Sequence, residues 1–291
     1  MDLSIIIVNW KVKDLVKRLV DSIFRYTKDI NFEIIVVDND SGDGSVELLL
    51  RSFPNIKVIA SDKNLGFAGG CNKGIEVARS DFILLLNPDT EIFDDSLMRL
   101  VHWMRAHPEA GIGSGKVLNP DHTIQRDVRR FPTIFSQFLI VLKLHHLFKK
   151  VKSLKQYFAR DFDYEKEQEV DQVIGAFFCI RRSVIEKIGL LDDAFFVWFE
   201  EVDFCKRTKE AGFKIIYTPK VSVIHHGGES FAQVFALKKQ RYYNASLRTY
   251  SKKHFGFLAW LLFTVISPLS LLLAWLVGLL KIKPKAYVRK I

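Results

Sequence analysis

Two adjacent carboxylates, Glu200 and Glu201, directly follow an apolar run within the segment 195–207. A third carboxylate, Asp203, stands at the start of an expected helix that closes at Gly212. Carboxylates set against a hydrophobic wall are candidates for general acid–base chemistry, because such surroundings shift their pKa values. The positive end of a helix dipole also favours acidic residues, so this segment by itself leaves both interpretations open.

The expected helix separates the roles of these three carboxylates. If it begins at Glu200, the side chains of Glu200 and Glu201 point about 100° apart, so only one can face a substrate. Arg207 lies four residues after Asp203, a spacing that favours an ion pair along one helix face. We therefore interpret Asp203 as a structural residue that supports the site, and Glu200 as the rival of Glu201 for the acid–base role.

Two more carboxylates end apolar runs, Asp38 in VVDNDS and Asp89 in LLLNPDT. A carboxylate between a strand and a glycine-rich turn can accept hydrogen bonds from a base or a sugar. The alternative for Asp38 is a turn-forming role. Pro88 fixes the backbone beside Asp89, and one carboxylate can hold a divalent cation that also binds two phosphates. A helix cap or a turn is the alternative for Asp89.

A glycine-rich loop and a histidine pair complete the set. The loop KNLGFAGGCNKG, residues 63–74, opens a helix, so its backbone N–H groups could bind phosphate, although it is not a Walker A loop. His225 and His226 follow a strand and precede Gly227. A neutral imidazole there can complete a cation site or contact a diphosphate. A pair of surface-loop histidines is the alternative, and proximity to Asp89 in the fold would argue against it.

The elements that must position these residues alternate between buried strands and helices in the first 120 residues. The expected strands are 3–8, 32–37, 56–60 and 82–86, and the expected helices are 13–26, 46–53 and 71–78. Continuous apolar strands separated by helices predict a Rossmann-like α/β fold, with a mostly parallel sheet covered by helices on both faces. Ligands bind beyond the carboxyl ends of the strands in such sheets, where Asp38 and Asp89 would meet.

The second half of the chain returns to strand and helix patterns. We expect a strand at 173–180, a short helix at 181–189, two short strands around Ile215 and Val223, and a long helix at 231–253. Residues 1–230 are therefore predicted to form the main domain. Residues 231–291 are predicted to form a C-terminal helix followed by a hydrophobic helical membrane segment.

Two segments indicate a membrane surface. Residues 257–280 carry no charge, and a bilayer-spanning helix needs roughly 20 apolar residues. Pro268 lies near the middle, so the segment could span once, turn back at Pro268, or lie as two half-helices in the interface. Residues 134–158 interleave lysines with apolar side chains, which indicates an insertion of one basic amphipathic helix or two short ones of the interfacial type. A packed surface helix is the alternative.

Charge and cysteine content indicate which kind of partner the protein binds and which compartment it occupies. The formal net charge of +10 favours an anionic partner. Basic residues flank the apolar segment on both sides, at Lys252, Lys253, Lys281, Lys283, Lys285, Arg289 and Lys290. No nucleic-acid motif accompanies this charge, and the lysines concentrate beside apolar segments, so we predict a membrane surface and no nucleic acid. Cys71, Cys179 and Cys205 form no CxxC pair, which favours a reducing compartment and argues against a metal–thiolate site.

Taken in chain order, these motifs resemble those of family 2 glycosyltransferases with a GT-A fold, and most of all bacterial rhamnosyltransferases that act on surface polysaccharides. The matching segments are SIIIVNW, VVDNDSGDGS, NLGFAGGCNKG, LLLNPDTEI, RRFP, GAFFCIRRSVIEKIGLLDDAFFVWFEEVDFCKR and VIHHGGES. The resemblance covers residues 3–230 and implies a GT-A domain over residues 1–230.

The resemblance also implies roles for residues that would bind the nucleotide sugar. Asp38 would bind the pyrimidine ring of the nucleotide, with Asn9 beside it. Asn64 and Gly66 would line the nucleotide pocket. Asn87 opens the sequence Asn-Pro-Asp, which stands where many family members carry Asp-x-Asp.

The same resemblance assigns the metal and the base. Asp89 would bind a divalent cation, Mg²⁺ or Mn²⁺, and His225 would contact that cation or the diphosphate. Glu201 matches the general base that deprotonates the acceptor hydroxyl, with Glu200 as its rival. We expect the helix dipole to keep Glu201 ionised at neutral pH.

The implied activity is that of an inverting glycosyltransferase. It would move L-rhamnose from dTDP-rhamnose onto a lipid-linked saccharide in cell-surface polysaccharide (O-antigen-like) synthesis, at the cytoplasmic face of the bacterial inner membrane. The alternatives are a transferase that uses UDP-galactofuranose, UDP-GlcNAc or another donor, and a non-catalytic membrane-anchored scaffold. The presence of Asp38, Asp89 and Glu201 argues against the scaffold.

Overall fold

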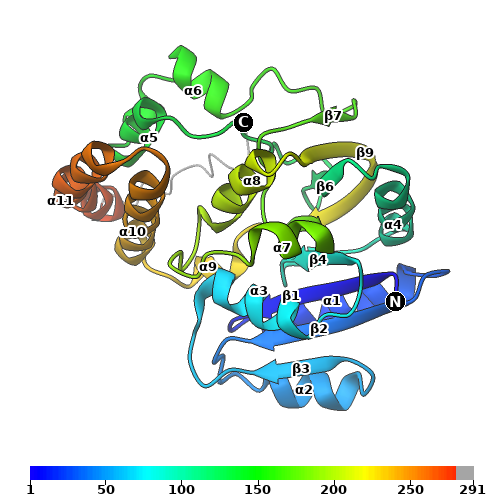
Figure 1. Cartoon of the computed structure of the whole chain (residues 1–291). Helices are drawn as coiled ribbons and strands as arrows, with labels where there is room; N and C mark the ends of the chain where they lie inside the picture. The colour runs from blue at the N-terminus through cyan, green and yellow to red at the C-terminus, as the bar shows by residue number, and fades with distance from the viewer. Residues whose placement is uncertain (280–291) are drawn as a thin grey trace.

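The computed structural model describes residues 1–279, and within them nine strands form one sheet flanked by helices (Figure 1). The strands are β1 Leu3–Asn9, β2 Phe32–Asp38, β3 Lys57–Ala60, β4 Phe82–Leu86, β5 Thr90–Glu91, β6 Ala110–Leu118, β7 Gln168–Glu169, β8 Phe177–Arg181 and β9 Lys214–His225. Residues 280–291 lie outside the described residues, and with them the basic residues Lys281, Lys283, Lys285, Arg289 and Lys290 that were expected to flank the apolar segment.

The helices connect and cover these strands. They are α1 Lys13–Tyr26, α2 Ser45–Ser52, α3 Gly66–Val77, α4 Ser96–Ala106, α5 Ile134–Val141, the 3₁₀ helix η1 Leu144–His146, α6 Lys152–Tyr157, α7 Arg182–Ile188, α8 Glu200–Glu210, α9 Glu229–Ala232, α10 Ala236–His254 and α11 Phe257–Leu279. The alternation of strand and helix over the first four strands confirms the predicted α/β class.

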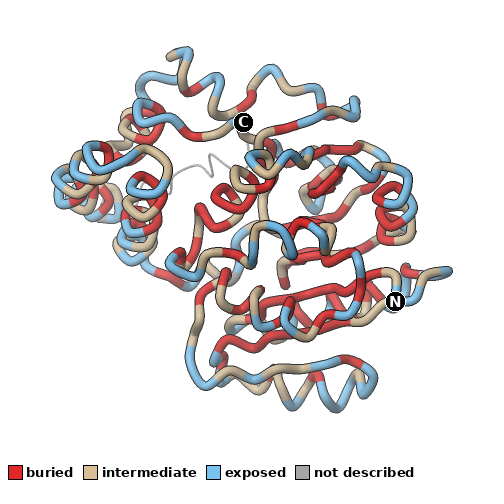
Figure 2. The backbone as a smooth tube through the Cα atoms, in the orientation of Figure 1, coloured by how far each residue is buried: buried red, intermediate tan, exposed pale blue. Residues whose placement is uncertain are grey.

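The sheet is covered on both faces because its central strands are apolar on both sides. In β1 the side chains of Ile5 and Ile7 pack with α1 and α4, whereas Ile6 and Val8 pack with α3. Successive side chains of a strand point to opposite faces, so an unbroken apolar run needs two covering layers. Figure 2 shows this as a buried backbone through the middle of the molecule.

The direction of the strands brings their functional ends to one edge. The strand order is β3-β2-β1-β4-β8-β6-β9-β5, and β1 to β4 are parallel as predicted. β8 is antiparallel to both β4 and β6, while β6 and β9 are parallel. The carboxyl ends of β1, β2, β4, β6 and β9 therefore lie at the edge where β8 begins.

Several elements differ from the sequence prediction. The strand expected at 173–180 is β8, but its antiparallel direction was not predicted; it follows the long segment 119–176 rather than a crossover helix, so it starts at the ligand edge. The two strands expected around Ile215 and Val223 are one strand, β9, with a register shift in its pairing with β6. The helix expected at 71–78 begins earlier, at Gly66. The helix expected at 231–253 is divided into α9 and α10.

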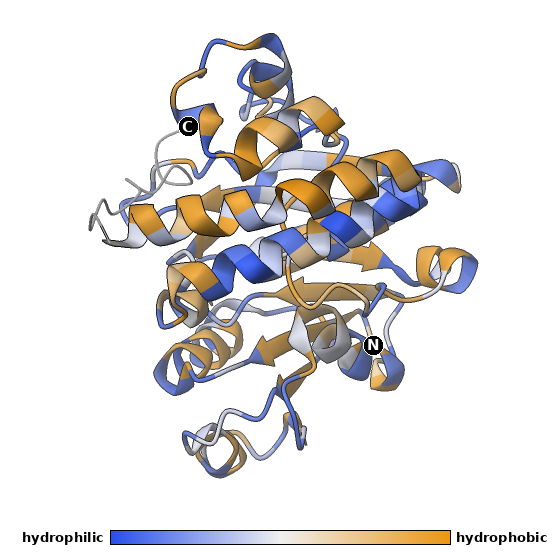
Figure 3. Ribbon diagram, turned by 90° about the vertical axis from the view of Figure 1, so that its left-hand side faces the viewer, coloured by the Kyte–Doolittle hydropathy of each residue, from blue (hydrophilic) through white to orange (hydrophobic). Residues whose placement is uncertain are grey.

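The C-terminal helices share a core with the main domain. This third cluster, separate from those on the two faces of the sheet, comprises Val141, Phe195, Phe199, Val202, Leu247, Tyr250 and Phe263. It joins the start of α8 to α5, α10 and α11, across the boundary predicted at residue 230. Figure 3 shows α11 lying along α10. Among residues 1–279, the stretch Phe257–Gly278 is the one that is long and apolar enough to cross a membrane.

The segment predicted as a basic amphipathic insertion, 134–158, forms two short α-helices, α5 and α6, with η1 between them. Two short helices were one of the predicted forms. Thr133 caps α5, since its hydroxyl accepts a hydrogen bond from the Ser136 N–H while the Ser136 hydroxyl accepts one from Thr133. This reciprocal cap fixes where the insertion begins its first helix.

Candidate active site

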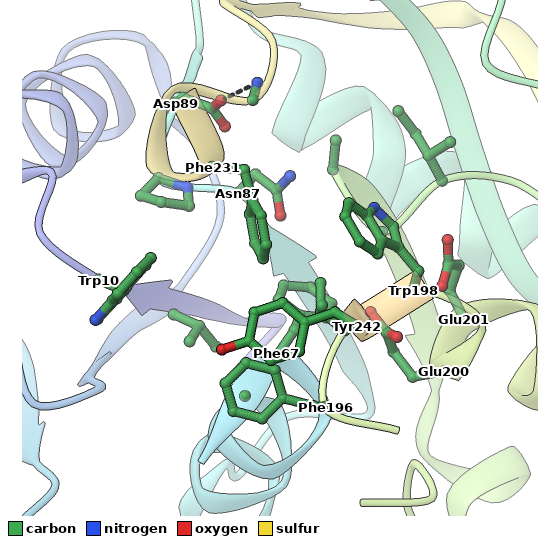
Figure 4. A pocket seen from close by; sticks show the side chains of 18 of the residues that line it. Trp10, Phe67, Asn87, Asp89, Phe196, Trp198, Glu200, Glu201, Phe231 and Tyr242 are labelled. Atoms are coloured by element: carbon green, nitrogen blue, oxygen red, sulfur yellow. Dashed lines mark hydrogen bonds between the residues drawn. The ribbon is translucent and has the colours of Figure 1, made fainter. Parts of the chain in front are cut away.

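A cavity of about 510 Å³ opens at the edge where the parallel strands end (Figure 4). Seven residues predicted from the sequence line it: Asn64, Gly66, Asn87, Asp89, Glu200, Glu201 and His225. Three others, Asn9, Asp38 and Asp203, do not line it. The topology therefore brings together most of the motifs that the sequence singled out, although they are spread over more than half of the chain.

Asp38, which was predicted to bind the nucleotide, forms hydrogen bonds with Asn9 and within the turn that follows β2. Its Oδ1 accepts a hydrogen bond from Asn9 Nδ2 at 2.7 Å, and its Oδ2 accepts one from the Ser41 backbone N–H at 3.0 Å. The next residue, Asn39, lines the cavity and donates from Nδ2 to the Gly66 carbonyl at 2.7 Å. In this structure Asn9 and Asp38 fix the turn, and Asn39 is the side chain of the turn that reaches the cavity.

Gly66 marks the close approach of the glycine-rich loop to the segment before α8. Its φ is +73°, and the Asn64 side chain accepts a hydrogen bond from its N–H at 2.9 Å. The neighbouring Phe67 N–H donates to the Phe196 carbonyl at 2.8 Å. A Cβ atom at position 66 would lie 2.2 Å from that same carbonyl oxygen. Only glycine fits here, so the loop and the carboxylate segment pack directly against each other.

We expect Gly66→Ala to destabilise the protein by about 2–5 kcal/mol, because backbone strain and a steric clash add at this position. The measurement is the free energy of unfolding in denaturant. Gly189→Ala is the matched control, since Gly189 has a similar φ of +80° but nothing within 4 Å of the added Cβ. Equal destabilisation by the two substitutions would contradict the proposed close approach.

Asp89 and His225 form the candidate cation site. Asp89 is buried, and its Oδ2 accepts backbone hydrogen bonds from Gly228 at 2.8 Å and Glu229 at 3.1 Å. Its Oδ1 lies 3.3 Å from His225 Nε2. Burial raises the pKa of Asp89, but the nearby His225 and the Glu229 N–H outweigh burial and bring the pKa below its ordinary value. Asp89 is therefore a carboxylate at neutral pH.

Gln125, which the sequence analysis missed, contacts both the backbone and the imidazole ring of His225. Its Nε2 donates to the His225 carbonyl at 2.6 Å, and its Oε1 lies 3.0 Å from His225 Nδ1. When a cation is bound, a proton on Nδ1 directed at the amide oxygen would leave the Nε2 lone pair available to that cation. The buried Nε2 atom makes no hydrogen bond of its own.

This pair fits a divalent cation that takes most of its ligands from elsewhere. Within residues 1–279 no group of three or more His, Cys, Asp or Glu side chains is arranged to hold a metal. Mg²⁺-type sites commonly use one or two protein ligands and fill the remaining positions with phosphate oxygens and water. Asp89 Oδ1 and His225 Nε2 offer one oxygen and one nitrogen that lie 3.3 Å apart, close enough for one cation to contact both.

A strained turn presents the two glutamates to the cavity. Trp198 and Phe199 both have left-handed backbones, with φ of 64° and 70°, directly before α8 begins at Glu200. Such conformations cost about 1–3 kcal/mol each in residues other than glycine and concentrate at functional sites. Figure 4 shows Glu200 and Glu201 on the side of the cavity opposite Asp89. α8 begins at Glu200, as assumed in the sequence analysis, so the side chains of Glu200 and Glu201 point in different directions.

Burial controls the protonation of both glutamates. Burial raises the pKa of Glu200 well above its ordinary range, and the adjacent Glu201 raises it further. Burial raises the pKa of Glu201 to about 7, against the lowering effect of the backbone N–H groups at the start of the helix. The helix terminus acts in the predicted direction, but desolvation is the larger effect. Glu201 therefore titrates near neutrality, while Glu200 stays protonated.

Asp203 is structural, as interpreted from its spacing. It is fully buried, and its oxygens contact Arg207 Nε at 2.8 Å, His254 Nε2 at 2.7 Å and Lys253 Nζ at 2.9 Å. Burial raises its pKa, but hydrogen bonds from His254, Lys253 and Arg207 outweigh burial and bring the pKa to about 2. The predicted pair with Arg207 is confirmed. The contacts with α10 tie α8 to the C-terminal helices.

Aromatic side chains that the sequence analysis did not single out form much of the wall. Phe196 stacks on Tyr242 of α10, with ring centroids 4.7 Å apart. The ring centroids of Trp198 and Phe231 are 5.2 Å apart, and those of Phe231 and Trp10 are 6.5 Å apart. Flat aromatic faces suit the stacking of a nucleotide base or the apolar face of a sugar. Trp10, Phe196 and Trp198 lie within the matching sequence segments, whereas Phe231 and Tyr242 lie outside them.

A layered α/β sheet with this cavity at its strand ends, an acidic residue after β4 and buried carboxylates at the start of α8 define a GT-A, nucleotide-sugar-dependent glycosyltransferase. Comparison with known proteins gives the family. The chain belongs to Glycosyl transferase family 2, whose sequence model matches residues 4–189.

Curated relatives and a solved structure agree with this family. The chain is 28% identical over 272 residues to the rhamnosyltransferase WbbL of Escherichia coli strain K12, covering 86% of this chain and 96% of that protein. It is 24% identical over 208 residues to an N-acetylglucosaminyl-diphospho-decaprenol L-rhamnosyltransferase of Mycobacterium tuberculosis, covering 68% of this chain and 67% of that protein. These similarities confirm the recognised family and its closeness to rhamnosyltransferases.

The fold is likewise shared with a solved enzyme. The mannosyltransferase PcManGT from Pyrobaculum calidifontis, solved in complex with GDP-Man and Mn²⁺, matches with a TM-score of 0.58 at 14% identity. The match covers 94% of this chain and 73% of that chain. It confirms the predicted GT-A fold.

Proposed function

We propose that this protein is an inverting glycosyltransferase that depends on a divalent cation and acts on a lipid-linked saccharide. The observation that carries the proposal is the placement of Glu201, with a pKa of about 7, across the cavity from the Asp89–His225 pair. One side of such a cavity can activate an acceptor hydroxyl, and the other can receive a diphosphate leaving group.

In the proposed reaction Glu201 takes the proton of the acceptor hydroxyl as that oxygen attacks the anomeric carbon of the donor sugar. The bond from that carbon to the nucleoside diphosphate breaks, and the configuration at the carbon is inverted. Asp89 and His225 would hold a divalent cation, which supplies positive charge for the diphosphate as it leaves. Asn87 and Asn64 line the cavity and would orient the donor.

We propose L-rhamnose from dTDP-rhamnose as the transferred sugar. The support is the similarity to two proteins named as rhamnosyltransferases, one of which acts on a diphospho-decaprenol-linked sugar by its name. UDP-galactofuranose and UDP-GlcNAc are the alternative donors. The polysaccharide product and the lipid-linked acceptor are proposed on the same support, together with action at the cytoplasmic face of the bacterial inner membrane.

The test is a thermal-shift panel of nucleoside diphosphates and nucleotide sugars on the full-length protein, with and without Mn²⁺. We expect dTDP and dTDP-rhamnose to stabilise the protein selectively, and Mn²⁺ to increase that stabilisation. Selective stabilisation by UDP species would show that the donor is a UDP sugar rather than dTDP-rhamnose, and would leave the proposed chemistry unchanged. No stabilisation by any nucleotide would overturn the proposal in favour of a non-catalytic scaffold.

Gln125 provides a test of the cation site that does not rely on activity. Gln125→Leu removes both contacts to His225, so Nε2 is no longer directed at Asp89. Removing such supporting partners typically weakens metal affinity about 10- to 100-fold. We expect that loss in Mn²⁺ binding measured by calorimetry with dTDP present.

Gln172→Leu is the matched control for that substitution. Gln172 is also a buried glutamine that donates to a backbone carbonyl, that of Arg130, but it does not line the cavity. We expect this variant to lose stability and keep its Mn²⁺ affinity. Unchanged Mn²⁺ affinity in Gln125→Leu would argue that His225 takes no part in the cation site.

A further inference from the structure

One long face of α11 is apolar and exposed. Its exposed large side chains are Phe257, Leu258, Leu261, Val265, Leu269, Leu272, Trp275 and Leu276. At 100° per residue they fall within an arc of about 120° on the helix surface. The stripe continues along the 23 residues of the helix and contains no charged side chain. Isolated exposed apolar residues are ordinary, but a continuous stripe of this length marks a contact surface.

The opposite face of α11 is held to the enzyme by polar contacts. Ser267 and Ser270 are buried there, and the Ser267 hydroxyl accepts hydrogen bonds from Asn244 at 3.0 Å and Arg248 at 3.2 Å. Asn244 accepts further hydrogen bonds from Ser270 at 3.3 Å and from Gln240 at 2.9 Å. The two faces of α11 therefore differ. The polar groups of the inner face form hydrogen bonds with α10, whereas the apolar side chains of the outer face are exposed.

We propose that α11 lies flat in one leaflet of a membrane, with its exposed stripe in the lipid and its inner face on α10, and that it does not cross the bilayer. Crossing would require α11 to leave α10. The buried Asn244 would then lose its partners on α11, and Ser267 would be placed near the middle of the bilayer. An unpaired buried polar group costs about 1–3 kcal/mol, so separation is opposed at several positions.

The charges beside α11 fit an anionic lipid surface. Lys149, Lys150, Lys152 and Lys155 are exposed in the segment from the end of η1 through α6, and this segment packs beside α5, which contacts α11. Lys252 is exposed at the end of α10, just before α11 begins. Helices that lie in the interface combine an apolar face with neighbouring lysines, and each lysine near an anionic surface contributes attraction.

This placement brings the cavity close to the lipid surface. Lys239 and Tyr242 of α10 line the cavity, and α10 packs directly on α11. Packed helix axes lie about 8–10 Å apart, so one helix layer separates the cavity wall from the proposed lipid plane. A sugar attached to a lipid diphosphate could therefore reach Glu201 without leaving the membrane. This part rests on the proposed transferase function, whereas the orientation of α11 does not.

Depth-dependent fluorescence quenching tests the orientation. Single cysteines replace Leu258, Val265 and Leu272, each labelled with bimane on the full-length protein bound to vesicles of phosphatidylethanolamine and phosphatidylglycerol. The native cysteines are buried, so the label reacts at the introduced site. Lipids brominated at different acyl positions report depth. We expect all three positions to be quenched at one shallow depth, and Leu50→Cys on exposed α2 not to be quenched.

A crossing helix gives a different pattern, with Val265 much deeper than Leu258, and that result would overturn the proposal. The double variant Val265→Asp/Leu269→Asp provides a second measurement. We expect it to bind the same vesicles at least about tenfold more weakly, because two apolar anchors are lost. Unchanged vesicle binding, with loss of dimers in sedimentation, would show instead that a second copy covers the stripe.

Nucleotide binding separates this proposal from the proposed function. The double variant is altered only on the outer face of α11, so its thermal shift with dTDP and Mn²⁺ is expected to match the unchanged protein. Uniform shallow quenching without any nucleotide response would retain the membrane orientation and overturn the transferase function. A thermal shift with the nucleotide, combined with a Val265 position much deeper in the bilayer than Leu258, would retain the transferase function and overturn the membrane orientation.

Discussion

Glu201→Gln is expected to reduce sugar transfer about a thousandfold while leaving nucleotide binding intact. Glutamine keeps the size of the side chain but accepts no proton from the acceptor hydroxyl, and general bases contribute about 10²- to 10⁴-fold. Glu201 has the protonation behaviour that the role requires, since burial raises its pKa to about 7. The measurements are the steady-state kcat for transfer and the affinity for the nucleotide sugar by calorimetry.

Glu200→Gln is the matched control, because Glu200 is the adjacent residue and also lines the cavity. Burial keeps Glu200 protonated, and glutamine resembles a protonated glutamate in shape and lack of charge. We expect this variant to keep most of its activity. Loss of transfer in Glu200→Gln, with near-normal transfer in Glu201→Gln, would reverse the assignment of the base.

The same assignment fixes the sign of the pH dependence. The base acts as a carboxylate, so kcat/KM is expected to rise with pH up to about 7 and then level off. Below that pH, each unit of acidification protonates more Glu201 and lowers the rate about tenfold. A rate that is already level from pH 5 upward would mean that a group with an ordinary carboxyl pKa acts as the base.

Asp89→Asn is the substitution with the second largest expected effect. We expect transfer to fall about 100- to 1,000-fold, as when charge stabilisation of a leaving group is removed. The amide oxygen can still accept the hydrogen bonds from Gly228 and Glu229, so the melting temperature should change little. The charge that would attract a cation is lost. Mn²⁺ binding with dTDP present, measured by calorimetry, should therefore become undetectable.

Glu91→Gln is the control for this effect. Glu91 lies two residues from Asp89, but it faces His226, with 3.4 Å between Glu91 Oε2 and His226 Nε2, and it does not line the cavity. We expect normal Mn²⁺ binding and transfer. If Asp89→Asn kept full metal dependence, the cation would be held elsewhere and the assignment of Asp89 would be wrong.

The sequence predicted the parts of the site that depend on strand ends. Asp89 and His225 are 136 positions apart, yet Asp89 follows β4 and His225 is the last residue of β9, and both strands stop at the same edge of the sheet. Apolar strand runs and the turns after them are visible in the sequence, so the position of these residues in the fold could be inferred. The start of α8 at Glu200 was predictable for the same reason, since an acidic run follows an apolar one.

Contacts made by side chains across the fold could not be predicted in this way. Asp38 lies at a strand end as expected, but its oxygens are used by Asn9 and Ser41, and Asn39 reaches the cavity instead. Gln125 and Tyr242 belong to segments without a motif, and they meet the site only through tertiary packing. The protonation of Glu201 depended on how burial compares with the helix terminus, which requires the surrounding structure.

The ion cluster around Asp203 sets a limit on how the protein can be shortened to a water-soluble form. Removing residues 257–291 eliminates the apolar helix and keeps Lys253 and His254, the two partners of Asp203 on α10. Ending the chain a few residues earlier removes both and leaves a fully buried carboxylate with Arg207 alone. Loss of partners from a buried charge costs about 3–5 kcal/mol. Successful solubilisation therefore depends on a cut after His254, even though none of the described residues from 243 to 279 lines the cavity.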